Sequence, residues 1–489
     1  MMSQNAQKMA RGGAWTVAAN IAKISAGLVV LPILTRLLTA SEFGLIQMAM
    51  PVIVFTMVFN NAGLGPALVR ADTCSDELWS SAFWANIAIG TIFTVLLITT
   101  APLVALFYGT TSIIPLISTL SVAILLQTAS IVPAAWLQRE FQFKQLAISD
   151  ILGNGLGVIV VITTALLGFG VWSLVLQQLA THAARTAYLW LRAHPAIRFS
   201  INWRELQSIT GFSVNVNLSD LANFFGRNAD NIIIGREFGT TSLGYYSIAY
   251  RLMLLPIQVF SWGIATVLLP GLSQMKRDPS RLCAASMRIF KIVSVVTFPI
   301  MAGACALSEP LIVSVLGETM RPAAIMLAIL APVGAMQSLS SSHGSIYMAI
   351  GRADIMFRWS LFCNVIIVTG FIFAIPWGAK GVAISYLVSN LLLAPPGYWI
   401  LFRLMGLSMK QFLSGIIPIA GSAIGMGAAV WWAARLLAER GNSEPLILAV
   451  CIPLGVFIYS MSILTAARGA LNEVISLARQ ATSRQISQA

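Results

Sequence analysis

The sequence predicts an all-α polytopic membrane protein of about 14 transmembrane helices. Of its 489 residues, 57% are hydrophobic and only 10% are charged, and the mean hydropathy is +0.83. A soluble domain usually carries about 25% charged residues, so this chain lacks the charge to cover a water-facing surface. Its apolar runs are continuous, and many reach the roughly 20 residues that a helical span needs. A membrane β-barrel would instead show alternating segments of about ten residues.

Fourteen apolar segments define the predicted spans. Short linkers such as 39–42 and 168–170 make the helices on either side antiparallel neighbours, and no loop is long enough for a soluble domain. The predicted spans are 14–38, 43–61, 80–106, 112–135, 147–168, 171–192, 210–235, 243–270, 287–309, 322–348, 355–376, 379–402, 412–437 and 446–466.

The basic residues predict the orientation of these spans. With the N-terminus in the cytoplasm, and residues near the span ends counted with the adjacent side, 21 of the 30 Lys and Arg residues fall on the cytoplasmic side, six fall on the other side, and Lys23, Arg227 and Arg251 lie deeper within spans. Lys and Arg concentrate in the cytoplasmic loops of membrane proteins, so both termini are expected to be cytoplasmic. The net charge of +13 therefore reflects orientation rather than nucleic-acid binding.

An internal repeat relates the two halves of the chain. A shift of 200 residues places Arg36 on Arg236 and Gly44 on Gly244, and shifts of 211 to 213 align 138–139 with 351–352 and 170–171 with 381–382. The repeat contains six spans, so both copies have the same orientation and are related by a pseudo-two-fold axis along the membrane normal. We expect an N-terminal lobe at 1–200, a second lobe at 201–405, and two further helices with a cytoplasmic tail at 406–489.

The stretch 211–239 carries unusual charge for a membrane span. Asp220, Asn223, Arg227 and Asn231 follow a 3-4-4 spacing that places them on one helix face, and Asp230 follows Arg227 by three residues. Charged residues inside spans normally face a protein interior or a wet cavity, which favours a binding site. The alternative is an intrahelical salt bridge between Arg227 and Asp230, which would ease insertion of the segment.

Two further intramembrane cations suit an anionic cargo. At the shift of 200, Asn20 and Lys23 align with Asp220 and Asn223, so polar positions recur in the first span of each lobe. Arg251 lies too deep in its span to reach the interface easily, although Lys23 could extend to the inner interface. The predicted substrate-binding residues are Lys23, Arg227, Arg251, Asp220, Asn223 and Asn20.

Enzymatic signatures are missing from the sequence. It contains no P-loop, HExxH or GxSxG motif, and its five cysteines show no metal spacing, so we expect no catalytic residue, metal or cofactor. Asp230 and His343 are the candidates for coupling transport to an ion, although a lone His on an apolar helix more often bonds a neighbouring hydroxyl group.

The chain resembles the Wzx-type polysaccharide flippases of the multidrug/oligosaccharidyl-lipid/polysaccharide (MOP) superfamily. The resemblance covers nearly the whole chain and thins after residue 400. It is strongest in RGGAWTVAANIAKISAGLVVLPILTRLLTASEFGLIQMA near the N-terminus, and in DNIIIGREFGTTSLGYYSIAYRLMLLP followed by LLPGLSQM at the start of the second lobe.

The resemblance implies a function. It implies a multi-pass protein of the bacterial inner membrane that moves undecaprenyl-pyrophosphate-linked oligosaccharide repeat units by alternating access, for exopolysaccharide or lipopolysaccharide biosynthesis. It also implies membrane lipid as a partner, together with a polymerase and export machinery. Two lobes suffice for one pathway, so we expect a monomer. The alternative is a cation-coupled multidrug or metabolite antiporter of the same superfamily, for which Asp220 and Asp230 would be the acidic groups.

Overall fold

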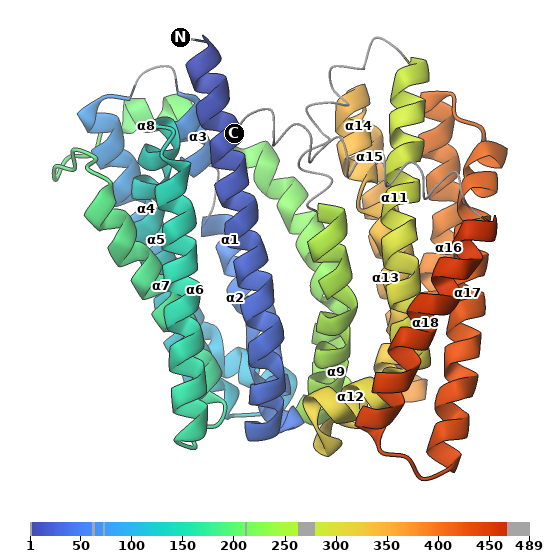
Figure 1. The fold of residues 1–489 in the computed structure, drawn as a ribbon. Helices are drawn as coiled ribbons and strands as arrows, with labels where there is room; N and C mark the ends of the chain where they lie inside the picture. Colours follow the sequence, from blue (N-terminus) through green and yellow to red (C-terminus); the bar gives the residue numbers. More distant parts are fainter. Residues whose placement is uncertain (1, 61–63, 72–73, 211–212, 263–278, 467–489) are drawn as a thin grey trace. The chain divides into compact units, whose positions relative to one another are not determined.

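The computed structural model describes residues 2–60, 64–71, 74–210, 213–262 and 279–466, and it confirms the all-α prediction (Figure 1). Within these residues the chain forms helices joined by short turns, with no β-strand. The helices are α1 (Met2–Leu37), α2 (Ala40–Asn60), α3 (Leu64–Arg70), α4 (Asp76–Tyr108), α5 (Ile113–Arg139), α6 (Phe143–Leu166), α7 (Trp172–Arg192), α8 (Trp203–Thr210), α9 (Ser213–Pro256), η1 (Ile257–Trp262), α11 (Pro279–Ala306), α12 (Ser308–Leu316), η2 (Glu318–Met320), α13 (Ala323–Ser340), α14 (His343–Ile350), α15 (Ala353–Ala374), η3 (Ile375–Trp377), α16 (Gly378–Met405), α17 (Met409–Glu439) and α18 (Glu444–Ala466).

The helices have the length and surface of membrane spans. Ten helical regions in the described residues are long and apolar enough to cross a bilayer, and one of them, Ala353–Met405, contains both α15 and α16. Large apolar side chains lie exposed on the helices, such as Leu106 at 81% and Ile424 at 70%, which suits a surface in contact with lipid rather than water. The polar helices α7 and α9 are not among the ten regions, so the count of 14 spans stays a prediction.

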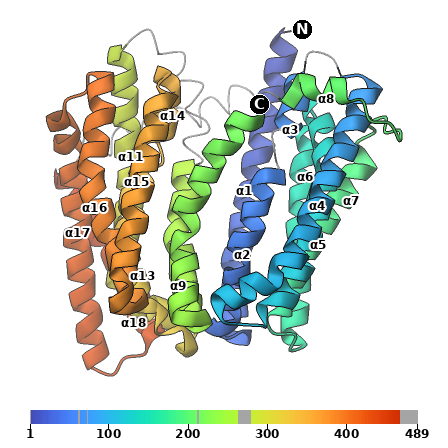
Figure 2. The ribbon, with the colours of Figure 1, turned by 180° about the vertical axis from the view of Figure 1, so that it is seen from behind.

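The chain divides into two compact units, Met1–Gly244 and Tyr245–Ala489. In the first unit, α1 packs along α6, and α4 forms an antiparallel pair with α5 (Figures 1 and 2). In the second unit, α11 packs against α13 and α17. The boundaries predicted at residues 200 and 405 follow the sequence repeat rather than this division, and they stay a prediction.

Two breaks separate helices at positions that the predicted repeat aligns. Between α1 and α2, the Glu42 carboxylate accepts hydrogen bonds from the Thr39 backbone N–H at 2.8 Å and from its hydroxyl at 3.0 Å, which caps the start of α2. Within α9 the backbone leaves helical geometry at Gly239, with φ 77° and ψ −177°. Glycine adopts this positive φ without the steric cost of a side chain, so α9 is two helices joined at Gly239.

The helices that follow these breaks meet at two glycines, a contact that we call the glycine crossing. A Cβ atom built on Gly44 would lie 1.7 Å from the Thr240 carbonyl oxygen, and one built on Gly244 would lie 1.8 Å from the Ala40 carbonyl oxygen. The Ser41 and Thr240 hydroxyl oxygens are 2.7 Å apart beside them. The predicted repeat aligns residue 40 with 240 and 44 with 244, so each glycine meets the residue that aligns with the other's neighbour, and the contact is reciprocal.

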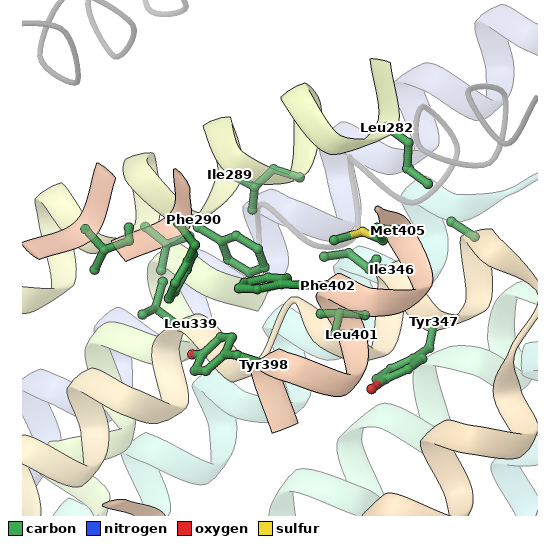
Figure 3. Packing of buried hydrophobic residues seen from close by; sticks show 14 residues of the cluster. Leu282, Ile289, Phe290, Leu339, Ile346, Tyr347, Tyr398, Leu401, Phe402 and Met405 are labelled. Atoms are coloured by element: carbon green, nitrogen blue, oxygen red, sulfur yellow. The ribbon is translucent and has the colours of Figure 1, made fainter. Parts of the chain in front are cut away.

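The second unit has an aromatic core between α11, α14, α16 and α17 (Figure 3). The Phe290 ring lies 6.1 Å from that of Phe402 and 5.6 Å from that of Phe412 between centroids, both at angles typical of edge-to-face packing. Leu401 and Ile346 are fully buried beside these rings. Side-chain packing in this core therefore holds one end of the unit together.

Arg321 joins three segments at the opposite end of the second unit. Its guanidinium pairs with Glu318 of η2, with Nε 2.6 Å from Oε1, with Glu309 of α12, and with Glu444 at the start of α18, 3.8 Å away. The hydrogen-bonded guanidinium of Arg321 lowers the pKa of the Glu318 carboxyl below its ordinary value.

Acidification is expected to loosen this Arg321 contact. A carboxyl with a lowered pKa in the folded state stabilises the fold above its unfolded pKa, and this contribution is lost as the pH falls through the lowered value. The thermal midpoint of the wild type should therefore fall slightly more between about pH 5 and about pH 3 than that of Glu318→Gln. Glu439→Gln is the control, because Glu439 pairs only within α17, with Arg435. Equal pH dependence in Glu318→Gln and the wild type would contradict the role of Glu318.

Candidate functional site

The charged stripe predicted on residues 211–239 lies on the first part of α9, but its charges point in different directions. Arg227 is exposed, whereas Asp230 is only 4% exposed and accepts a hydrogen bond from the Asn231 backbone N–H at 2.8 Å. Among the described residues no ion pair joins Arg227 to Asp230, so the salt-bridge alternative is not observed. Phe224, on the same helix, anchors it to Phe55 of α2, with ring centroids 5.3 Å apart.

Two predicted residues of this stripe are placed only by their backbone. Asp220 and Asn223 belong to helix α9, while their side chains lie outside the described part of the structure. Their roles in substrate binding therefore stay predictions.

Asn20 and Lys23 lie one helical turn apart on α1, and both are exposed. Helix α1 packs along α6, and this contact covers only one side of α1. Lys23 makes no ion pair within the residues that the structure describes. Its ammonium group is therefore available to an anionic ligand.

The remaining predicted residues belong to the second unit. Arg251 is exposed on the part of α9 that follows Gly239 and has no ion-pair partner in the described ranges. His343 opens α14, where its ring centroid lies 4.7 Å from that of Tyr398 and 6.0 Å from that of Phe290. This aromatic setting is typical of a core histidine, and coupling of His343 or Asp230 to an ion stays a prediction.

A charged pair that the sequence did not predict connects three helices of the first unit. Arg185 on α7 donates from Nε to Asp150 Oδ1 on α6 at 2.7 Å and from Nη1 to Ser130 Oγ on α5 at 3.2 Å. Arg185 and Asp150 lie near the ends of the predicted spans 171–192 and 147–168, so the sequence did not single them out as a site. One signal in the sequence could have indicated this pair. Arg185 lies seven residues before the end of α7, and Asp150 lies seven residues after the start of α6, which is about 10 Å along each helix.

An apolar cavity of about 1140 Å³ lies within the second unit, between α11, α13, α16 and α17. Met301, Pro332 and Ile416 are among its apolar lining, and the charged groups of Glu309, Arg321 and Glu444 lie at one end. None of the predicted substrate-binding residues whose side chains the structure describes lines this cavity. Apart from the charged groups at that end, the lining is mainly apolar, which suits hydrocarbon.

Comparison with known proteins places the chain in a family. The family described as "Polysaccharide biosynthesis protein" matches residues 33–325. The succinoglycan biosynthesis transport protein ExoT of Rhizobium meliloti (strain 1021) is 28% identical over 479 residues, which cover 97% of this chain and 96% of that protein. The resemblance to polysaccharide exporters that the sequence predicted is thereby confirmed.

Solved structures share the fold. The lipid II flippase MurJ, in an inward closed conformation, superposes with a TM-score of 0.75 at 16% identity, covering 94% of this chain and 99% of that one. A multidrug resistance MATE family transporter of the MOP superfamily, in an inward-facing conformation, gives 0.64 at 15% identity, covering 79% of this chain and 94% of that one. At these identities the likeness shows the fold alone.

Proposed function

We propose that this chain, which belongs to the polysaccharide biosynthesis protein family, moves lipid-linked oligosaccharide repeat units across the bacterial inner membrane. The cargo would be an oligosaccharide joined to undecaprenyl through a pyrophosphate group. The process it serves would be the assembly of an exopolysaccharide or lipopolysaccharide. The name of the ExoT relative supports this class of transport, since that protein serves succinoglycan biosynthesis.

The observation that carries the proposal is the set of unpaired cations inside predicted spans. In the part of the chain that the structure describes, Lys23, Arg227 and Arg251 are exposed and have no ion-pair partner. An uncompensated charge in a membrane helix costs several kcal/mol, so these cations require water or an anionic ligand. Arginine binds phosphate oxygens through two parallel hydrogen bonds, which suits a pyrophosphate.

The transport cycle follows from the predicted arrangement in the membrane. With both termini in the cytoplasm, the pyrophosphate would reach Lys23 and Arg227 from the inner leaflet. The two lobes would then rock to expose the site to the other side, in alternating access. Lipid surrounds the exposed apolar helices, and a polymerase with export machinery would receive the cargo from a monomeric transporter.

The second candidate is a cation-coupled multidrug or metabolite antiporter. The solved multidrug transporter has the same fold, although its TM-score is lower than that of the lipid II flippase. A cationic drug would need accessible carboxylates, yet Asp230 is buried and accepts a hydrogen bond from a backbone N–H. The unpaired cations therefore favour the flippase.

A deletion strain tests the proposed function. Loss of the gene is expected to remove a surface or secreted polysaccharide and to leave lipid-linked repeat units on the inner leaflet. Both effects should be reversed by the wild-type gene on a plasmid. Normal polysaccharide together with altered drug sensitivity would refute the flippase and support the antiporter.

A further inference from the structure

Arg185 is held in place on two sides by neighbouring helices. Its Nε–H donates to Asp150 Oδ1 at 2.7 Å, and its Nη1 group donates to Ser130 Oγ at 3.2 Å. Each partner belongs to a different helix, so the guanidinium plane is restrained by α5 and α6 while its backbone belongs to α7. A side chain that is fixed before a ligand arrives loses little entropy on binding it.

Close packing of α6 against α7 brings these groups together. A Cβ atom built on Gly153 would lie 2.8 Å from the Thr181 carbonyl oxygen and 3.2 Å from Arg185 Cβ. One built on Gly157 would lie 2.1 Å from Thr181 Oγ1. The two glycines form a GxxxG pattern, which lets membrane helices approach closely. The position of Arg185 is therefore set by the close contact between α6 and α7, and not only by its own side-chain rotamer.

One edge of the Arg185 guanidinium remains open. Arginine has five N–H donors, and Nη2 has no hydrogen-bond partner within the ranges that the structure describes. The side chain as a whole is 29% exposed, so it is not sealed inside the helix packing. Its fork of donors matches the oxygens of a phosphate group.

The charge around Arg185 is positive although Asp150 is paired with it. Asp150 is the only acidic residue in the sequences of α1, α5, α6 and α7. Lys23 lies on α1 and Arg185 on α7, and both helices pack against α6, which carries Asp150. Asp150 can neutralise one of these two cations, so one positive charge is left over and attracts an anion.

We propose that Arg185 is a further contact for the phosphate of the cargo, with Asp150 and Ser130 as positioning residues and Lys23 as a second cation on the other helix packed against α6. This inference rests on the proposed function and adds a residue to its binding site. The contrasting reading is that the Arg185–Asp150 pair only fastens three helices together. The two hypotheses predict different ligand selectivity when Arg185 is replaced. If the pair only holds the helices together, the binding of every lipid is affected equally. If Arg185 contacts phosphate, only the binding of charged lipids is weakened.

The test is lipid binding to the purified full-length protein in nanodiscs. The probes are undecaprenyl pyrophosphate, the uncharged undecaprenol, and phosphatidylglycerol as an unrelated anionic lipid. Arg185→Gln is expected to weaken binding of undecaprenyl pyrophosphate about tenfold or more while leaving undecaprenol binding unchanged, because it removes charge-assisted hydrogen bonds. Ser130→Ala should give a smaller loss with the same selectivity. Arg352→Gln is the matched control, because Arg352 also pairs with one aspartate, Asp354, at 3.1 Å.

Three results would overturn the inference. Equal weakening for undecaprenyl pyrophosphate and undecaprenol in Arg185→Gln would show a fastening role, as would unchanged binding with a lower melting temperature. An equal loss for phosphatidylglycerol would show a general site for anionic lipid. If the wild-type protein itself bound undecaprenyl pyrophosphate no better than undecaprenol, the proposed function would fail first, independently of any variant.

Discussion

Replacing Gly44 by alanine is expected to destabilise the protein by about 3 kcal/mol or more, because the added methyl group overlaps backbone atoms that cannot rotate away. The new Cβ would lie 1.7 Å from the Thr240 carbonyl oxygen, so α2 and α9 must separate to admit it. The measurement is the thermal midpoint of the purified protein in detergent. Gly244→Ala should have a similar effect, since its Cβ would lie 1.8 Å from the Ala40 carbonyl oxygen.

The control for this prediction is Gly425→Ala on α17. No atom lies within 4 Å of a Cβ built on Gly425, and alanine is favoured over glycine inside helices by roughly 1 kcal/mol. Gly425→Ala should therefore leave the midpoint unchanged or raise it, opposite in sign to Gly44→Ala. A Gly44→Ala protein as stable as the wild type would show that the two helices are not in contact at these glycines.

Arg227→Gln is expected to reduce translocation of the lipid-linked oligosaccharide about tenfold or more. The substitution keeps a side chain of similar polarity but removes the positive charge and the paired donors, and hydrogen bonds to charged groups contribute roughly 1.5 to 3 kcal/mol. The measurement is polymer export in a deletion strain that carries the variant, at matched protein levels. Arg227→Lys should retain part of the activity, because it keeps the charge without the fork of donors.

Arg236→Gln provides the comparison on the same helix. The Arg236 guanidinium lies 4.3 Å from the Phe107 ring centroid and pairs with the adjacent Glu237 at 3.4 Å, so its charge is already engaged. Export in this variant should stay within about twofold of the wild type, since exposed ion pairs contribute little. Comparable losses in Arg227→Gln and Arg236→Gln would argue against a specific phosphate contact at Arg227.

Helix positions were predictable from the sequence because hydropathy acts locally. Each predicted span overlaps a helix of the structure, although the segment 243–270 extends into residues outside the described ranges. The sequence also predicted the break within α9, because residues 236–242 separate the predicted spans 210–235 and 243–270. The backbone angles give its position, Gly239.

The sequence predicted only those site residues that can be recognised from their own position in the chain, such as a charge within an apolar run. Lys23, Arg227 and Arg251 stand out as charges in apolar runs, and the structure leaves them exposed. By contrast, the orientation of Asp230 depends on how α9 packs in the first unit, which the 3-4-4 spacing does not specify. The pairing of Arg185 with Asp150 depends on the contact of α6 with α7 across 35 residues of sequence.

The glycine crossing also constrains how the two copies of the repeat can diverge. Where side chains of two segments touch, a substitution in one segment can be compensated by a changed side chain in the other. At residues 44 and 244 that route is closed, because each position faces the other copy's main chain rather than a side chain. Replacement of either glycine would therefore be selected against, and both copies are expected to keep glycine there while their other residues change.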